Sequence, residues 1–310
     1  MSLRVRSLFR PKTLLALLVV CGFATSQLAC GGGGSGSGTV QTPTAAGQST
    51  FDHVILVVEE NHSYSDVIGN SSMPYFNSLA SQYGLATQYF ANTHPSLPNY
   101  LVLTTGLMEA SDGFTGVISD DNVVRELVKV GKTWKAYAES LPSPGYLGGD
   151  SGGYVRGHNP FIYLSDVQND LTQAANIVPF TQFATDLANN ALPQYSFIAP
   201  NLMDDAHDGT LAQADAWLQT NIAPLIASSA FQNGGLLIIT FDEGLDSDVE
   251  HGGGQVATVI ISSSGKKGFQ SKTLYQHQSV LRLILAGSGV TNFPGLSATA
   301  PDMTEFFPGH

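Results

Sequence analysis

The chain has 310 residues, of which 43% are hydrophobic and 9% aromatic, so it has the composition of a globular protein with a sizeable core. Its formal net charge at pH 7 is −12, from 13 basic and 25 acidic residues. Such an acidic balance excludes nucleic acid as an expected partner.

The first 30 residues have the layout of a bacterial export signal. Four basic residues between Arg4 and Lys12 precede the apolar run LLALLVVCGFA, which is short for a permanent membrane span. The sequence LAC, ending at Cys30 and followed by a glycine-rich stretch, is typical of a lipoprotein processing site. We predict that Cys30 is lipidated and anchors the exported protein in a membrane, facing the periplasm or the cell surface. Ordinary cleavage near Cys30 and full secretion are the alternatives.

Removing this leader changes the charge and leaves one folded segment. Four basic residues are lost and all 25 acidic residues stay, so the net charge changes from −12 to −16. Residues 31–48 are rich in Gly, Ser and Thr without apolar periodicity, which predicts a flexible linker. Residues 49–310 contain no internal repeat and no second break in composition, so we expect a single domain there.

Strands and helices alternate along residues 49–310. We predict strands at 53–58, 86–91, 133–138, 195–199, 234–241 and 256–262. We predict helices at 73–84, directly after Ser96, and at 122–130, 211–228 and 278–289, with a glycine-rich loop at 142–160. Continuously apolar strands separated by helices indicate an α/β fold, a three-layer sandwich with a mostly parallel central sheet.

Polar residues follow four of these strands, where sites of α/β folds gather. Singly, each has a structural explanation as a turn residue or a helix cap. Together they indicate a cation, because carboxylates that converge on one edge repel each other. The residues are Glu60 and Asn61, Ser96, Asp205 and His207, and Asp242 and Glu243. Their oxygen atoms suit a divalent metal ion, and nearby histidines leave Ca, Mg, Mn, Zn and Fe all open.

Ser96 lies between two prolines at the predicted start of a buried helix. Pro95 and Pro98 restrict the backbone, and the free N–H groups of a helix start favour an anion such as a phosphoryl group. A metal ion beside it would lower the pKa of the hydroxyl and make it a nucleophile. The structural alternative is that Ser96 only caps the helix.

Six segments, read together, resemble a known family. They are VILVVEENHSYSDVIG, THPSLPNYLVLTTG, GHNPFIY, IAPNLMDDAHDG, LLIITFDEG and YQHQSVLRLI, and they span about residues 51–290. The set is similar to the bacterial phosphoesterases that include secreted acid phosphatases and non-haemolytic phospholipases C. Residues 73–106 resemble, more distantly, the nucleophile region of the alkaline phosphatase superfamily. The resemblance implies an alkaline phosphatase-like fold, with 49–310 as the catalytic domain.

The resemblance also implies roles for individual residues. Ser96 would be the nucleophile and form a phosphoserine, and His207 would protonate the leaving alcohol. The metal ligands would be Glu60, Asn61, Ser96, Asp242 and Glu243, with Asp205 added if a second metal is present. Asn99, His158 and His251 would contact the phosphate of the substrate, although a plain helix contact is an equal reading for Asn99.

The function implied is metal-dependent hydrolysis of phosphomonoesters, of the acid phosphatase kind, including phosphoinositide head groups. A phospholipase C-type phosphodiesterase is one alternative, and a non-catalytic surface lipoprotein that keeps the fold is another. Either catalytic reading implies a small phosphate ester or a phospholipid head group as the substrate. Sulfatase chemistry is disfavoured, because Tyr100 stands where the sulfatase pattern C/S-x-P-x-R has arginine.

Overall fold

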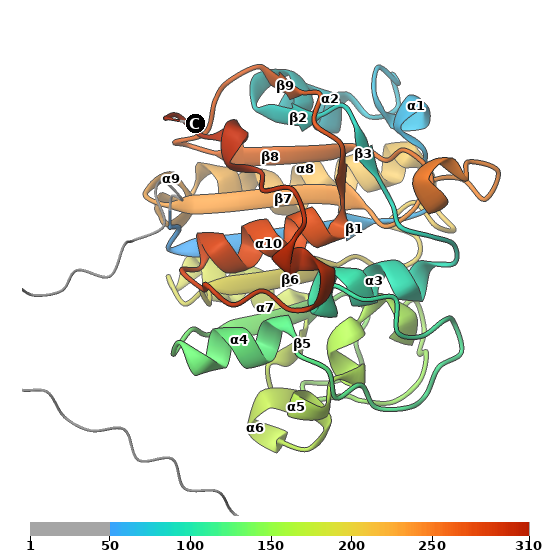
Figure 1. The fold of residues 1–310 in the computed structure, drawn as a ribbon, viewed down its shortest axis with the longest axis vertical. Coiled ribbons are helices and arrows are strands. Elements are labelled where there is room, and N and C mark those ends of the chain that lie inside the picture. The colour runs from blue at the N-terminus through green and yellow to red at the C-terminus, as the bar shows by residue number, and fades with distance from the viewer. Residues whose placement is uncertain (1–49, 310) are drawn as a thin grey trace, which may run out of the picture. The chain divides into compact units, whose positions relative to one another are not determined.

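The computed structural model describes residues 50–309 (Figure 1). The predicted signal peptide at 1–30, the lipidation site Cys30 and the linker at 31–48 lie outside the described residues. Within residues 50–309, none of the helices combines the length and the apolar character that a membrane span requires.

The described residues form strands and helices in alternation. The strands are β1 (His53–Glu59), β2 (Gly84–Ala86), β3 (Tyr89–Phe90), β4 (Trp134–Ala138), β5 (Ile177–Pro179), β6 (Tyr195–Ala199), β7 (Gly235–Phe241), β8 (Thr258–Ser262), β9 (Phe269–Ser271) and β10 (Tyr275–Gln276). The helices are α1 (Tyr64–Val67), α2 (Pro74–Gln82), α3 (Ser96–Thr105), α4 (Val123–Lys129), α5 (Ser165–Gln168), α6 (Leu171–Ala174), α7 (Thr181–Ala188), α8 (Leu211–Ala227), α9 (Ser229–Gln232) and α10 (His277–Gly287). Short 3₁₀ turns occupy Arg156–His158, Pro160–Tyr163, Glu250–Gly252, Gly295–Ala298 and Thr304–Phe306.

The central sheet has the strand order β5-β4-β6-β1-β7-β8-β2-β9. Its neighbouring strands are parallel except at β8, which runs antiparallel to both β7 and β2. β8 follows β7 after a loop without a crossover helix, and such a connection returns the chain in the opposite direction. The predicted mostly parallel sheet is confirmed.

Helices cover both faces of this sheet. α3, α4 and α10 lie in front of it in Figure 1 and contact one another, whereas α8 lies behind it and packs on α2. All ten residues of α3 are buried, so this helix is enclosed on every side, as its apolar sequence predicts. The burial fixes the position of Ser96, the first residue of α3.

Two predicted boundaries differ from the structure. The single strand expected at 86–91 is divided into β2, in the central sheet, and β3, which pairs with β10. The helix expected to end at Gly84 ends at Gln82, and Gly84 begins β2. A Cβ atom on Gly84 would lie 2.4 Å from the Phe306 ring, so this glycine permits close packing of the strand.

Candidate active site

Three neighbouring strands bring the acidic segments to one edge of the sheet. β1 lies between β6 and β7 and is parallel to both, so the segments that follow them leave the sheet at the same end. The Glu60 N–H donates to the Asp205 carbonyl at 2.8 Å, and the Asp242 N–H donates to the Glu59 carbonyl at 2.9 Å. These main-chain bonds hold the carboxylate-bearing residues side by side.

Asp242 and Glu243 follow the last residue of β7, Phe241. Because they lie outside the strand, their side chains need not point to opposite faces of the sheet. The Asp242 Oδ1 accepts from the N–H of Glu243 at 2.6 Å and from that of Asn61 at 3.2 Å. Asn61 has a φ of 56°, a left-handed conformation that asparagine tolerates better than most residues. Two consecutive acids can therefore face one site.

Ser96 is the first residue of α3 and its hydroxyl points at this acidic edge. The Ser96 Oγ lies 3.2 Å from the Glu60 Oε2 and 3.4 Å from the Glu243 Oε1. Pro95, not Ser96, occupies the cap position of the helix, and the hydrogen bonds of the Ser96 Oγ are to these two carboxylates. The structure therefore gives no support to the alternative in which Ser96 serves only as a helix cap.

The loop that leads into α3 is held by backbone packing. Cβ atoms on Gly252 and Gly253 would lie 2.1 Å from the Asn92 carbonyl oxygen and 2.5 Å from that of Thr93. Glycine at both positions therefore lets the 250–254 segment touch this loop. The Asn99 carboxamide oxygen accepts from the N–H groups of Asn92 and Thr93, at 3.0 and 3.2 Å.

Other side chains orient the two glutamates. The Tyr100 hydroxyl donates to the Glu60 Oε1 at 2.5 Å. At Glu243, the Oε2 lies 3.1 Å from the His94 Nδ1 and accepts from the Asn99 amide at 3.2 Å. Asn99 thus contacts the predicted metal ligand Glu243 and the loop that leads into α3, so its amide nitrogen and its carbonyl oxygen both have partners within the protein.

His158 connects the two sides of the cluster. Its Nε2 lies 3.2 Å from the Glu60 Oε1, and its Nδ1 lies 3.4 Å from the Asp205 Oδ2. The ring stacks on Tyr100 with 5.2 Å between centroids. Predicted as a phosphate contact, His158 lines the cavity beside Ser96 and also lies between two carboxylates, where a neutral imidazole nitrogen could ligate a metal.

The buried carboxyl groups raise each other's pKa. Burial raises the pKa of Glu60 well above its usual range, and the charges of Asp242 and Asp205 raise it further. Burial and the charge of Asp242 likewise raise the pKa of Glu243 to about 9. Protonation is one way to relieve such crowding, and a bound cation is the other.

The residues present fit a divalent cation. Among the predicted metal ligands, three buried oxygens have no hydrogen-bond partner within residues 50–309: Asn61 Oδ1, Asp205 Oδ2 and Asp242 Oδ2. In the same part of the chain, the ion-pair partners found for Glu60, Asp205 and Glu243 are histidines. Two groups place one possible ligand atom per residue within 4.8 Å of the others, namely Glu60, His158 and Asp205, and His94, Glu243 and Asp246. Mixed oxygen and imidazole donors suit zinc, manganese or iron ions as well as harder cations.

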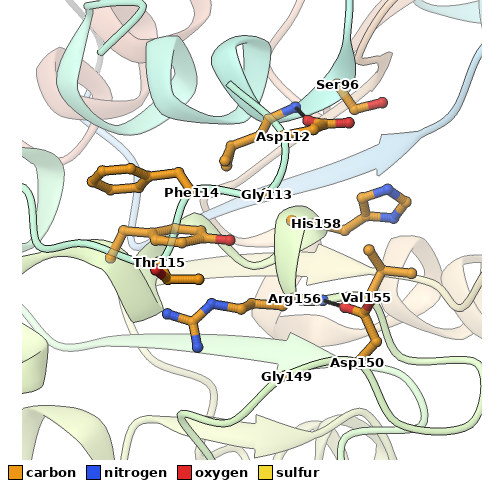
Figure 2. Close-up of a pocket in the computed structure, with 13 residues that line it drawn as sticks. Ser96, Asp112, Gly113, Phe114, Thr115, Gly149, Asp150, Val155, Arg156 and His158 are labelled. Carbon is orange, nitrogen blue, oxygen red and sulfur yellow. Dashed lines mark hydrogen bonds between the residues drawn. The ribbon is translucent and has the colours of Figure 1, made fainter. Parts of the chain in front are cut away.

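A cavity of about 300 Å³ opens beside Ser96. Figure 2 shows Ser96 and His158 on one side of it, and the Arg156 guanidinium across the cavity beside Thr115. At the mouth, the Asp112 carboxylate accepts from the Leu97 N–H at 3.0 Å. A substrate in this cavity could therefore reach the serine from the open side.

The other two predicted histidines, His207 and His251, are not among the residues that line the cavity beside Ser96. The His207 ring is 6.1 Å from the His158 ring, and its Nδ1 lies 2.8 Å from the Asp208 Oδ1. It lines a neighbouring hollow with Asn61 rather than the cavity beside Ser96. The structure does not bring His251 to the site: its ring packs on Phe90 at 4.3 Å.

Sequence reasoning did not assign Tyr100, Asp112 or Arg156 to the site. Tyr100 carried a usable signal, because it is four residues after Ser96 and therefore on the same helix face. Asp112 and Arg156 come from loops without periodicity, where no local pattern places a side chain.

Comparisons of the sequence find phosphatases. A model described as the phosphoesterase family matches residues 70–291. The phosphatidylinositol-3-phosphatase of Mycobacterium tuberculosis is 35% identical over 311 residues, which is 98% of this chain and 98% of that protein. The acid phosphatase of Aspergillus fumigatus is 34% identical over 253 residues, which is 77% of this chain but only 55% of the fungal protein.

Comparisons of the structure find the same fold. The phosphonate monoester hydrolase of Agrobacterium radiobacter aligns with a TM-score of 0.56 and 14% identity, over 83% of this chain and 77% of that chain. A Vibrio parahaemolyticus protein of the alkaline phosphatase superfamily aligns with a TM-score of 0.52 and 13% identity, over 79% and 68%. The predicted alkaline phosphatase-like α/β fold is confirmed.

Proposed function

Since the chain belongs to the phosphoesterase family and is a hydrolase of phosphoric ester bonds, we propose that it cleaves phosphomonoesters through Ser96 in a metal-dependent site. One observation carries the proposal. Ser96 is the first residue of a buried helix and lines a cavity, and its hydroxyl lies within 3.4 Å of two buried carboxylates.

The first step transfers the phosphoryl group to the protein. The Ser96 Oγ bonds to phosphorus while the bond from phosphorus to the ester oxygen breaks, and the Ser96 proton passes to the carboxylate that accepts its hydrogen bond. The helix start favours the negative charge of the phosphoryl group. We propose that His207 is the acid that protonates the departing alcohol, which requires its ring to turn from the neighbouring hollow toward the cavity beside Ser96. Water then attacks the phosphoserine, which releases inorganic phosphate and regenerates Ser96.

Glu60, Asn61, Asp242 and Glu243 would hold the metal ion with Ser96, and Asp205 and His158 would complete or extend the ligand set. A bound divalent ion would supply positive charge that lowers the pKa of the serine hydroxyl and offsets the charge of the phosphoryl group. Asn99 keeps Glu243 oriented, which supports the ligand set from outside.

The test of the nucleophile uses the purified full chain and p-nitrophenyl phosphate. Ser96→Ala should lower kcat by about 10⁴-fold or more, because it removes the hydroxyl that lies against both Glu60 and Glu243. Ser165→Ala is the matched control, since Ser165 is also the first residue of a helix, α5, and should leave kcat unchanged. Ordinary turnover by the Ser96 variant would exclude the proposed mechanism.

Metal dependence is tested by removing the metal ion and adding it back. Dialysis of the wild type against a chelator should abolish hydrolysis, and one of calcium, magnesium, manganese, zinc or iron should restore it. Elemental analysis of the untreated protein should find a stoichiometric ion. A chain with neither ion nor phosphatase activity would support the alternative of a non-catalytic surface protein.

The substrate class is the third part of the proposal. The relative that matches 98% of this chain is named for a phosphatidylinositol 3-phosphate monoester, which favours monoesters and includes phosphoinositides. Hydrolysis of mono- but not bis-p-nitrophenyl phosphate would agree with this class. Faster cleavage of the bis ester would favour the phospholipase C-type alternative.

We also propose that the protein is exported and anchored through lipidated Cys30, on the sequence pattern alone. Incorporation of labelled palmitate into the wild type, and its loss in Cys30→Ala, would agree with this. A labelled Cys30→Ala protein would reject it.

A further inference from the structure

The cavity beside Ser96 has one strongly basic side chain. Of the 13 residues that line it, Arg156 is the only lysine or arginine. Figure 2 shows its guanidinium on the opposite side of the cavity from Ser96 and His158. A phosphate held at Ser96 would thus leave Arg156 facing the remainder of the substrate.

The Arg156 side chain is held in place by the protein. Its Nη1 donates to the carbonyls of Leu147 and Gly148, at 2.8 and 3.2 Å. The guanidinium lies 4.9 Å from the centre of the Tyr163 ring, and Tyr163 is buried. A side chain fixed in this way loses little conformational entropy when it binds a ligand.

Two acids, Asp112 and Asp150, line the same cavity, but among the described residues neither forms an ion pair with Arg156. Asp150 is the nearest candidate in sequence, but its Oδ1 accepts from the Arg156 backbone N–H at 2.8 Å. Within residues 50–309, no ion pair joins the guanidinium to a carboxylate. The cavity therefore offers a positive group for an anion.

Arg282 shows that such contacts alone do not make a binding site. Its Nη1 donates to the carbonyls of Ser297 and Ala298, at 3.3 and 2.7 Å, and its guanidinium lies 4.9 Å from the Phe293 ring. Arg282 has the same kind of contacts as Arg156 but does not line the cavity beside Ser96. Location is what distinguishes Arg156.

We propose that Arg156 binds a second anionic group of the substrate, so that the enzyme prefers phosphomonoesters that carry another phosphate. This inference rests on the proposed function, because Ser96 must hold the phosphate that is removed. A guanidinium matches phosphate oxygens with two parallel N–H donors. The second phosphate could be the diester of a phosphoinositide lipid or a free phosphate on a soluble polyol.

The experiment compares three substrates on the full chain. Inositol 1,3-bisphosphate carries two free phosphates, inositol 3-phosphate carries one, and dioctanoyl phosphatidylinositol 3-phosphate carries a diester in place of the second. The wild type should show a kcat/KM at least tenfold higher for both two-phosphate substrates than for inositol 3-phosphate. Equal values for all three would overturn the proposal without any variant.

Arg156→Gln should remove this preference, mainly by raising KM. The fall in kcat/KM should be at least ten times larger on a two-phosphate substrate than on inositol 3-phosphate, and Arg156→Lys should restore part of it. A preference lost only on the lipid would identify the lipid diester as the second group, and one lost on both would identify phosphate in either form. An equal fall on all three substrates would contradict the proposal.

Arg282→Gln is the control for the loss of a stacked guanidinium. It should lower the thermal midpoint about as much as Arg156→Gln and leave the substrate preference unchanged. If Arg156→Gln does not fold, the wild-type comparison and Arg156→Lys still decide. Should the wild type hydrolyse none of the three substrates, and no p-nitrophenyl phosphate either, it is the proposed function that fails.

Discussion

Asp186 and Asp242 are both buried aspartates, and their surroundings differ sharply. The Asp186 carboxylate accepts from the Lys135 ammonium at 2.5 Å, the Tyr137 hydroxyl at 2.7 Å and the Gln182 amide at 2.9 Å. Burial alone would raise the pKa of Asp186, but these donors outweigh it and hold the pKa below its usual value. Its charge is satisfied by the protein itself.

Asp242 has no such cation beside it. Its Oδ1 accepts two backbone N–H groups, its Oδ2 has no hydrogen-bond partner within residues 50–309, and Glu60 and Glu243 lie next to it. Burial raises the pKa of Asp242. The comparison indicates that Asp186 serves the fold, whereas Asp242, whose Oδ2 lacks a partner, is available to bind a ligand.

Of the changes that test this comparison, Asp242→Asn should have the largest effect. It removes a proposed metal ligand, so kcat/KM for p-nitrophenyl phosphate should fall by about 10³-fold. Without metal, the same change relieves repulsion among buried acids and should raise the free energy of unfolding by about 1 kcal/mol. Kinetics and urea unfolding of the chelator-treated protein measure the two effects. If the metal-free variant is less stable than the metal-free wild type, Asp242 contributes to the fold as Asp186 does, and the contrast between the two aspartates is wrong.

Asp186→Asn makes the same chemical change at the satisfied site. It should lower the free energy of unfolding by about 2 kcal/mol, because Lys135 loses its buried partner. Activity should stay at the wild-type level, since Asp186 lies on α7, outside the proposed site. Urea unfolding and p-nitrophenyl phosphate kinetics on one preparation give both values. A large loss of kcat in a folded variant would contradict the assignment of Asp186 to the fold.

A smaller effect concerns pH. Because the folded-state pKa of Asp186 lies below the unfolded value of about 3.9, its ionised form stabilises the fold above that value. This contribution is lost as pH falls through the folded-state pKa. The stability gap between wild type and Asp186→Asn should therefore be constant near neutral pH and narrow in acid. Urea unfolding of both proteins at pH values of about 6 and about 3 measures it; a gap that widens in acid would reverse the sign of the argument.

The sequence predicts the acidic edge because its residues directly follow apolar strands. Glu60 and Asn61 follow β1, and Asp242 and Glu243 follow β7, so the order of strands alone brings them together. The start of a helix can also be predicted from the sequence, and Ser96 is the first residue of such a helix. In these cases the local pattern places the residue directly at the end of a strand or the start of a helix.

Loop residues depend on contacts that no local pattern contains. His251 belongs to a glycine-rich segment that packs on the 92–93 backbone, and that packing directs its ring onto Phe90. Arg156 is placed by the carbonyls of a distant part of the same loop. The antiparallel direction of β8 likewise does not follow from its own residues, since an apolar strand reads the same in either direction; it follows from the connection to β7 without a crossover helix.

Asp112 is such a loop residue, and its substitution should have the smallest effect that we predict. Its exposed carboxylate accepts from the Leu97 N–H, the first backbone donor after Ser96, where an anionic substrate would also seek a hydrogen bond. Asp112→Asn keeps an acceptor but removes the negative charge, so inorganic phosphate should inhibit about threefold more strongly. Competitive inhibition of p-nitrophenyl phosphate hydrolysis measures this, and the gain should shrink as salt is added. Weaker inhibition would mean that Asp112 helps to bind phosphate. Asp112 would then belong with Asp242 among the acids that serve the site, and not with Asp186.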